Sequence, residues 1–277
     1  MKEQRRSPAL SSPSNPRIRA ASGLRDRRER DASGLTIVDG AREIRRALDA
    51  GVEFVEAFVC DPLLAGGDAR VALDGLTALA IPIHRTTEAA QAKLAFGERA
   101  EGLVAVIRPR FANLGELTPQ DDALIVVAEG VEKPGNIGAI LRSADGAGAD
   151  AIIVASPRTD LANPNVIRAS AGTSFSLPLA SAPAEAVLDW LRRHRVRILA
   201  TRVEATVTYT DTDFTGPTAI ILGAEDRGLT SVWTADDIEA VRLPMLGVGD
   251  SLNVSVTAAV LLYEARRQRQ VHRAEVD

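Results

Sequence analysis

The sequence predicts an α/β protein with two domains, the second of them built on a parallel sheet. After residue 122, apolar runs typical of strands alternate with helical patterns, and this alternation indicates strands paired in parallel through helical crossovers. Before it lies a polar stretch that contains Pro109 and Pro119, which is typical of a connection. We therefore expect a first domain at residues 31–109, a linker at 110–122 and a second domain at 123–277.

Length and composition are those of an ordinary globular protein. The chain has 277 residues, enough for two moderate domains, and 45% of them are hydrophobic. No apolar run is long enough to span a bilayer, and the N-terminus lacks the apolar segment of a secretory signal. The single cysteine, Cys60, fits a reducing compartment, and its alternating surroundings predict a buried, inert thiol. We expect a cytoplasmic protein without a membrane partner.

Charge is unevenly spread along the chain. The formal net charge of −4 argues against a uniformly basic nucleic-acid binder, but it leaves a local basic patch open. Residues 1–30 are rich in Ser, Pro and Arg and poor in apolar residues, so we expect a flexible tail with room for a short helix at its end. Such a tail is either an arm that touches phosphates or an undirected, solvated segment.

The first domain shows the pattern of a small α/β fold. A helix at 41–50 carries Ile44, Ala47 and Leu48 on one face, and Gly51 follows as a stop signal. His84 has no neighbouring His, Cys or acidic cluster, so we predict no metal site. The remaining elements are expected as strands at 35–38, 52–60, 81–84 and 102–107, and helices at 69–78 and 87–94.

The second domain opens with a strand at 122–128 that is apolar throughout and therefore buried on both faces. Asn136 is a plausible cap for a helix at 137–146. Further strands are expected at 151–154, 177–179, 197–201 and 217–223, with helices that begin at Pro164 and at Pro183.

A polar set interrupts the apolar C-terminal segment. Residues 241–264 predict a strand, a loop and a helix, with Pro244 ending the strand because proline cannot donate to a ladder. Ser251 or Asn253 can cap the helix. Buried polar groups need partners, so Ser251, Asn253 and Ser255 bond either to nearby backbone or to a ligand and another loop.

Three segments carry a family resemblance: NIGAILR at 136–142, LGAEDRGL at 222–229 and SLNVSV at 251–256. Each follows a predicted strand, and in an open α/β sheet ligands bind at the carboxyl ends of strands. In this order they resemble the three motifs of the SpoU/TrmH (SPOUT) family of AdoMet-dependent RNA ribose 2′-O-methyltransferases. The sequence is most similar to the branch of thiostrepton-type resistance enzymes. The resemblance covers the second domain well and the first more loosely.

The resemblance implies a second domain with a deep trefoil knot, S-adenosyl-L-methionine (AdoMet) as cofactor, and a homodimer. It implies a first domain similar to a small fold of ribosomal proteins that binds RNA. The glycine-containing loops also loosely resemble dinucleotide loops, but neither completes that fingerprint. The implied cofactor residues are Thr201, Leu222, Gly223, Ala224, Gly228, Leu243, Pro244, Met245, Ser251, Leu252 and Asn253.

Arg142 is the residue that the resemblance implies for catalysis. Arginine is always charged and so is a poor base, but it can bind the phosphate beside the target ribose and favour the developing alkoxide. The alternative is a salt-bridged helix arginine. Asn136 and Glu225 are expected to orient Arg142 or the RNA, and Ser251 and Asn253 to organise the loop. The residues expected to contact RNA phosphates are Arg42, Arg45, Arg46, Lys93, Arg99 and Arg168, with a solvated surface as the alternative.

These implications point to methyl transfer from AdoMet to a ribose 2′-OH in ribosomal RNA, with large-subunit 23S rRNA preferred and antibiotic self-protection left open. Transfer RNA is the alternative substrate. A non-catalytic RNA-binding or ribosome-assembly protein is the alternative from another class. No DNA partner is expected.

Overall fold

A computed structural model describes residues 9–96 and 101–276. The chain divides into two compact units. Unit 1 contains Met1–Arg110 together with Leu161–Ser176, and unit 2 contains Phe111–Asp160 and Leu177–Asp277. The sequence did not reveal that residues 161–176 belong to unit 1. The physical reason is packing, because Ile167 lies in the hydrophobic core of unit 1.

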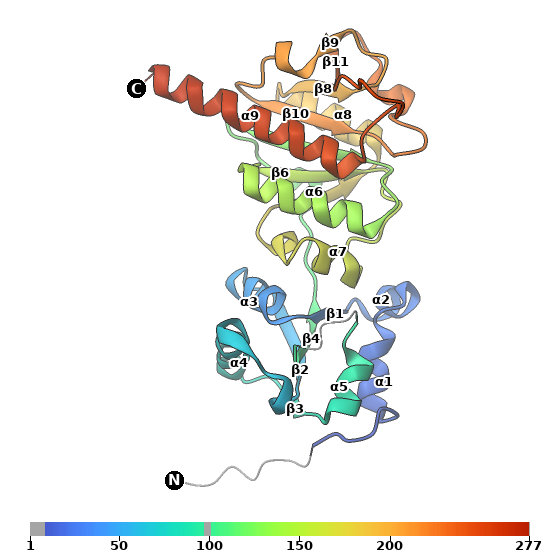
Figure 1. Ribbon diagram of the computed structural model, residues 1–277, viewed down its shortest axis with the longest axis vertical. Coiled ribbons are helices and arrows are strands. Elements are labelled where there is room, and N and C mark those ends of the chain that lie inside the picture. Colours follow the sequence, from blue (N-terminus) through green and yellow to red (C-terminus); the bar gives the residue numbers. More distant parts are fainter. Residues whose placement is uncertain (1–8, 97–100, 277) are drawn as a thin grey trace. The chain divides into compact units, whose positions relative to one another are not determined.

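Unit 1 is built on a four-stranded sheet in the order β1-β4-β2-β3 (Figure 1). Strand β4 runs antiparallel to β1 and β2, and β3 is parallel to β2. Cys60, directly after β2, is fully buried as predicted, and burial raises the pKa of its thiol. The strands are β1 (Thr36–Asp39), β2 (Glu53–Val59), β3 (Ile83–Arg85) and β4 (Leu103–Arg108).

Helices cover both faces of this sheet. Alternate strand residues point to opposite faces. Val38 and Ala105 pack with α3 (Ala41–Asp49) and α4 (Gly66–Ala78) on one face. Ile37 and Val104 pack with α1 (Pro16–Gly23) and α5 (Glu88–Leu94) on the other. The remaining helices are α2 (Arg27–Ser33), α7 (Pro164–Ala169) and the short 3₁₀ turns η1 (Asp61–Leu63) and η3 (Thr173–Phe175).

The prediction of a flexible tail over residues 1–30 is wrong for residues 16–30, whereas the short helix expected at its end is present as α2. Asn15 caps α1 by accepting a hydrogen bond from the Arg17 backbone N–H, at 2.9 Å. Ile18, Ala21 and Leu24 are buried against the sheet. These apolar residues recur at helical spacing, which the Arg-rich composition obscured. Residues 1–8 lie outside the described part of the chain.

Unit 2 holds a seven-stranded parallel sheet in the order β7-β6-β5-β10-β8-β11-β9 (Figure 1). This confirms the prediction of a parallel sheet. The last two strands are inserted between earlier ones, because β10 lies between β5 and β8 and β11 lies between β8 and β9. The strands are β5 (Leu124–Glu129), β6 (Ala151–Ala155), β7 (Leu179–Ala182), β8 (Arg197–Thr201), β9 (Val207–Thr208), β10 (Thr218–Leu222) and β11 (Ile238–Arg242).

Three helices flank this sheet. Helix α8 (Ala184–Arg193) packs on one face through Val187, Trp190 and Leu191. Helices α6 (Pro134–Ala147) and α9 (Val254–Val276) lie together on the other face (Figure 1). The 3₁₀ turns are η2 (Leu114–Glu116), η4 (Tyr209–Asp211) and η5 (Ser231–Trp233).

The segment predicted as a linker, residues 110–122, packs into unit 2 from Phe111 onward. The Ala112 backbone N–H donates to the Leu179 carbonyl at 2.9 Å, and Leu117 is buried in the core of unit 2. Residues 111–122 are therefore part of unit 2 and not a free connection. Across residues 9–96 and 101–276, no helix combines the length and the apolar character needed to cross a bilayer.

Candidate functional site

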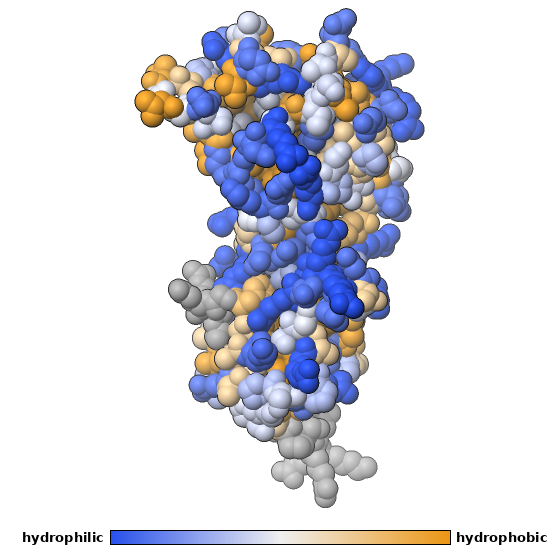
Figure 2. Space-filling model, turned by 90° about the vertical axis from the view of Figure 1, so that its right-hand side faces the viewer, coloured by the Kyte–Doolittle hydropathy of each residue, from blue (hydrophilic) through white to orange (hydrophobic). Residues whose placement is uncertain are grey.

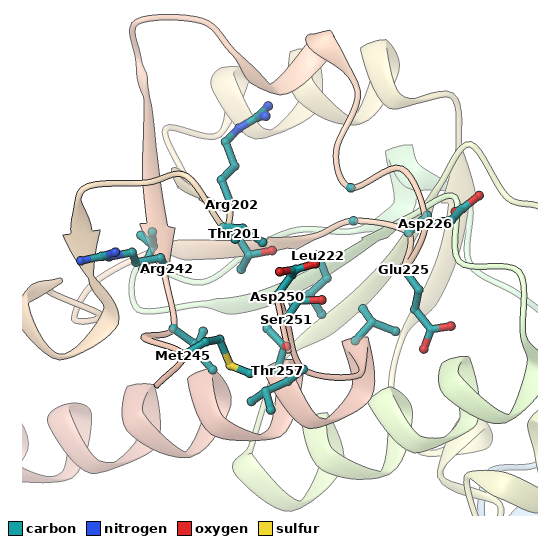
Figure 3. A pocket seen from close by; sticks show the side chains of 18 residues that line it. Thr201, Arg202, Leu222, Glu225, Asp226, Arg242, Met245, Asp250, Ser251 and Thr257 are labelled. Carbon is teal, nitrogen blue, oxygen red and sulfur yellow. The ribbon is translucent and has the colours of Figure 1, made fainter. Parts of the chain in front are cut away.

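A cavity of about 380 Å³ opens at the carboxyl ends of β8, β10 and β11 (Figure 3). The side chains of Thr201, Leu222 and Ser251 converge on it from three separate segments. Its remaining lining residues are Arg202, Val203, Gly223, Ala224, Glu225, Asp226, Gly228, Val241, Arg242, Leu243, Met245, Asp250, Leu252, Val254 and Thr257.

The loop after β10 is closed on itself. The backbone N–H of Ala224 donates to the Gly228 carbonyl at 3.2 Å, and the Gly228 N–H donates to the Ala224 carbonyl at 2.9 Å. Gly228 has a φ of +63°, which favours glycine. A side chain at Gly223 would collide with the backbone of Gly228 and Leu229. The second sequence motif is thus a tight backbone loop that forms one wall of the cavity.

Glu225 joins the three sequence motifs. Its carboxylate accepts hydrogen bonds from Lys133 Nζ at 2.7 Å, from Asn136 Nδ2 at 2.9 Å and from Asn253 Nδ2 at 2.6 Å. The hydrogen bond from Lys133 is the main reason why the pKa of Glu225 is lowered, and it raises the pKa of Lys133 in turn. Because Asn136 belongs to the first motif, Lys133 directly precedes the helix that carries it, and Asn253 belongs to the third motif, one carboxylate holds the three motifs together.

Asn253 serves two purposes. Its Oδ1 accepts hydrogen bonds from the backbone N–H of Ser255 at 2.9 Å and from the Ser255 hydroxyl at 2.6 Å, so it caps α9 as predicted. Its amide group reaches Glu225 in another loop. Both of the partners considered for this polar set, backbone and another loop, are therefore present. The Ser251 hydroxyl makes no hydrogen bond to any residue that the structure describes.

Asn136 is not the cap of α6, contrary to the prediction. Helix α6 begins at Pro134, a residue favoured in the first helical position because its ring already fixes φ. Asn136 therefore lies in the first turn, and its side chain is available for Glu225.

Arg142 does not contact the residues expected to orient it. It is exposed on α6, and its side chain forms no hydrogen bond or ion pair with any described residue. Arg142 lies six positions after Asn136, which is about 240° around the helix and about 9 Å along its axis. The two side chains therefore point in different directions, and Arg142 does not line the cavity of its own chain.

A second carboxylate, that of Glu129, binds the segment that follows the second motif. Glu129, at the end of β5, is only 2% exposed and accepts the Thr230 backbone N–H at 2.8 Å and the Thr230 hydroxyl at 2.7 Å. Arg202 donates to the Thr230 carbonyl at 3.4 Å and to the Trp233 carbonyl at 3.1 Å. Thr230 is thus held at each of its polar atoms, just beyond the second motif.

Most of the predicted cofactor residues line the cavity. The exceptions are Pro244 and Asn253. Sequence reasoning missed Arg202 and Val203, although they directly follow a predicted strand and the rule on carboxyl strand ends could have found them. It also missed Asp250, beside the predicted Ser251, and Thr257 in the first turn of α9. In the described part of the chain, no cluster of His, Cys, Asp or Glu could hold a metal ion.

The predicted RNA contacts lie in unit 1, and several are engaged within the protein. Arg45 pairs with Asp68 at 3.0 Å, and Arg46 donates to the Ala171 carbonyl at 2.7 Å. Arg168 pairs with the buried Asp39 at 3.1 Å and also donates to the Phe96 carbonyl. The side chains of the other two described candidates, Arg42 and Lys93, are exposed. Arg99 lies outside the described residues.

Residues 123–263 match the family model described as the SpoU rRNA methylase family. The chain belongs to this family. The motif loops, the cavity and the Glu225 network all lie within the matched residues. Residues 15–105 match a second model, described as an MRM3-like substrate binding domain, which includes α1 and α2.

Two curated relatives of this SpoU family member are named as 23S rRNA methyltransferases. The chain is 33% identical over 261 residues to the 23S rRNA (uridine(2479)-2′-O)-methyltransferase of Streptomyces viridochromogenes, covering 89% of this chain and 87% of that protein. It is 38% identical over 180 residues to the 23S rRNA (guanosine-2′-O-)-methyltransferase RlmB of Pseudomonas syringae pv. tomato, covering 62% and 72% of the two chains.

Solved structures share the architecture. A crystal structure of an RNA 2′-O ribose methyltransferase is 42% identical, with a TM-score of 0.85 over 95% of this chain and 100% of that one. The AdoMet-bound rRNA methyltransferase of Sinorhizobium meliloti is 26% identical, with a TM-score of 0.85 over 94% and 97%.

Proposed function

We propose that this chain transfers a methyl group from AdoMet to the ribose 2′-OH of a nucleotide in 23S rRNA. The observation that carries the proposal is the Glu225 network, in which one carboxylate ties the three family motifs together beside the cavity. Both curated relatives described above are named as 23S rRNA 2′-O-methyltransferases, which supports rRNA over transfer RNA.

The cavity suits AdoMet in size and chemistry. Its volume of about 380 Å³ is within the range of small-molecule sites. Leu222, Met245 and Leu252 offer apolar surface for an adenine ring, and the loop at Gly223 offers backbone groups for its edge. The carboxylate of Asp250 suits the positive charge of a sulfonium or ammonium group. When bound there, AdoMet would supply an electrophilic methyl group.

Methyl transfer requires little covalent help from the protein. The protein's main tasks are to hold the methyl donor and the ribose in line and to assist loss of the 2′-OH proton. We assign positioning to Glu225, Asn136 and Asn253, which hold the loops in one geometry. Ser251, whose hydroxyl has no bond to a described residue, is available for a ligand. Arg142 would bind the phosphate beside the target ribose and favour the developing alkoxide.

We propose a homodimer with a knotted second domain. Arg142 does not line the cavity of its own chain, so the proposed catalysis is completed by the partner subunit's Arg142. The knot is proposed from membership of the SpoU family, and the late strands β10 and β11, which lie between earlier ones, agree with it. Unit 1 would bind the RNA. Because its proposed substrate is ribosomal RNA, we place the protein in the cytoplasm.

The test is tritium transfer from labelled AdoMet to unmodified 23S rRNA and, separately, to transfer RNA. Label in alkali-resistant dinucleotides from 23S rRNA, lost in Arg142→Ala, is the expected result because a 2′-O-methyl group blocks alkaline cleavage. Arg193→Ala on α8, also an exposed helix arginine, is the matched control and should keep full activity. AdoMet binding without transfer to any RNA would refute the proposed activity.

A further inference from the structure

We propose that unit 1 binds the RNA backbone through the exposed surface of α1, α2 and α5, with Arg19, Arg28 and Lys93 as the phosphate contacts. We call this surface the α1–α5 face. The inference rests on the proposed function, because it takes RNA as the substrate. The α1–α5 face takes the place of helix α3 as the expected RNA contact.

Helix α3 offers less free charge than its sequence suggests. Of its three arginines, Arg45 is paired with Asp68 and Arg46 is bonded to the Ala171 carbonyl, which leaves Arg42. Counting side chains over α3 and α4 gives four basic and four acidic residues. This side of the sheet is therefore close to neutral, and a neutral surface gains little from a polyanion.

The α1–α5 face is basic in a chain whose net charge is −4. Residues 9–34 and 87–96 contain seven basic and four acidic side chains, and of the basic ones Arg30 is buried and Arg17 pairs with Glu56 at 3.3 Å. Two of the acidic groups are already engaged, because Asp26 caps α2 through the Arg28 backbone N–H at 2.8 Å and Asp31 pairs with Arg27 at 3.5 Å. Glu29 and Glu88 are the two remaining carboxylates on these elements.

Three cations on this face remain available. The side chains of Arg19, Arg28 and Lys93 are exposed and form no ion pair or hydrogen bond with any residue in the described part of the chain. Figure 2 turns this side of unit 1 toward the viewer and shows hydrophilic residues on it beside apolar ones. Unpaired cations bind phosphates most readily, because no existing ion pair has to be broken.

The face is also rigid. Ile18, Ala21 and Leu24 anchor α1 in the core beneath it. The guanidinium of Arg25 donates to the carbonyls of Lys93 at 2.8 Å and of Ala95 at 2.7 Å, at the C-terminal end of α5. Because Arg25 fixes the N-terminal segment to α5, the helices that carry the cations keep one arrangement, and less backbone entropy is lost on binding.

Two double charge reversals test the proposal in the full-length protein. Arg19→Glu/Lys93→Glu changes the α1–α5 face, and Arg42→Glu/Arg70→Glu changes α3 and α4 by the same total charge. Affinity for a 23S rRNA fragment is measured by filter binding at several salt concentrations, and AdoMet affinity is measured by calorimetry.

The first double variant is expected to weaken RNA binding on the order of tenfold or more and to lower the slope of log affinity against log salt by about 1.5. The second is expected to change binding by about twofold at most. AdoMet affinity should be unchanged in both. Equal weakening by the two variants, greater weakening by the second, or no weakening by the first would overturn the assignment. Failure of the wild-type protein to methylate RNA would instead count against the proposed function.

Discussion

Replacing Gly223 by alanine should disrupt the cavity, and the structure gives the size of the effect. An added Cβ would lie 2.4 Å from the carbonyl carbon of Gly228, 2.6 Å from the Leu229 nitrogen and 2.7 Å from the Gly228 oxygen. Carbon atoms normally approach to about 3.5 Å, so the backbone of Gly228 and Leu229 must move about 1 Å away from the new Cβ. It is backbone and cannot rotate aside, so the closed loop between Ala224 and Gly228 must move as a whole.

Overpacking of this kind costs about 1–3 kcal/mol of unfolding free energy, which is roughly 3–10 °C in Tm for a domain of this size. A misplacement of about 1 Å in a catalytic loop lowers the rate on the order of 100-fold. We therefore expect Gly223→Ala to bind AdoMet weakly in calorimetry and to be about 100-fold slower in single-turnover methyl transfer.

Gly247→Ala is the matched control. Gly247 lies in the third motif loop, and a Cβ there meets no atom within 4 Å. Its stability should stay within about 0.5 kcal/mol of the wild-type value. The steric reasoning is refuted if Gly223→Ala binds AdoMet and transfers methyl groups like the wild type, or if both variants are impaired alike.

Glu225, Thr230 and Asp39 give further predictions. Glu225→Gln keeps an oxygen for the two asparagine amides but loses its charge opposite Lys133, so we expect about a tenfold loss of methyl-transfer rate, against about 100-fold for Glu225→Ala; equal losses would contradict this. Because the pKa of Glu225 is lowered from 4.5, this network should persist at pH 5 and be lost only as the pH falls through that lowered value. Thr230→Val removes the hydroxyl donor to the buried Glu129 and should lower the unfolding free energy by about 1–2 kcal/mol in urea titrations, whereas Thr230→Ser should stay within about 0.5 kcal/mol. Burial raises the pKa of Asp39 from 3.8 to about 6, so the folded state holds this proton more tightly than the unfolded state. The unfolding free energy should therefore fall by about 2 kcal/mol between pH 4 and pH 6. Asp39→Asn should flatten this pH profile, and an unchanged profile in that variant would disprove the assignment.

The sequence was informative where periodicity and strand order decide the structure. Strands at 122–128 and 217–223 were predicted because buried parallel strands are continuous apolar runs. The three motif loops were expected at one sheet edge because each follows a strand, and the carboxyl ends of parallel strands meet there. The cap at Asn253 follows from a local rule about side chains at helix starts.

The pattern was uninformative where the outcome depends on long-range partners. Arg46 and Arg168 look like free cations in the sequence, but their acceptors are the distant Ala171 carbonyl and Asp39. Glu129 stands at the end of an apolar strand, and nothing local shows that Thr230 will satisfy its buried carboxylate. Likewise, the few apolar residues of α1 could be recognised as core only once the sheet that covers them was known.

The assembly of unit 1 from two stretches of chain has a consequence for biosynthesis. Residues 161–176 complete this unit, since Ile167 fills its core and the Thr36 hydroxyl donates to the Ala162 carbonyl at 2.6 Å. A ribosome releases these residues only after β5, α6 and β6 of unit 2 have been made. The N-terminal unit therefore cannot finish folding before the next one has begun, so maturation of the two is interleaved in time. A chimera that exchanges substrate-binding domains between relatives must likewise move both stretches, and one that cuts at residue 110 alone would leave Ile167 without its core.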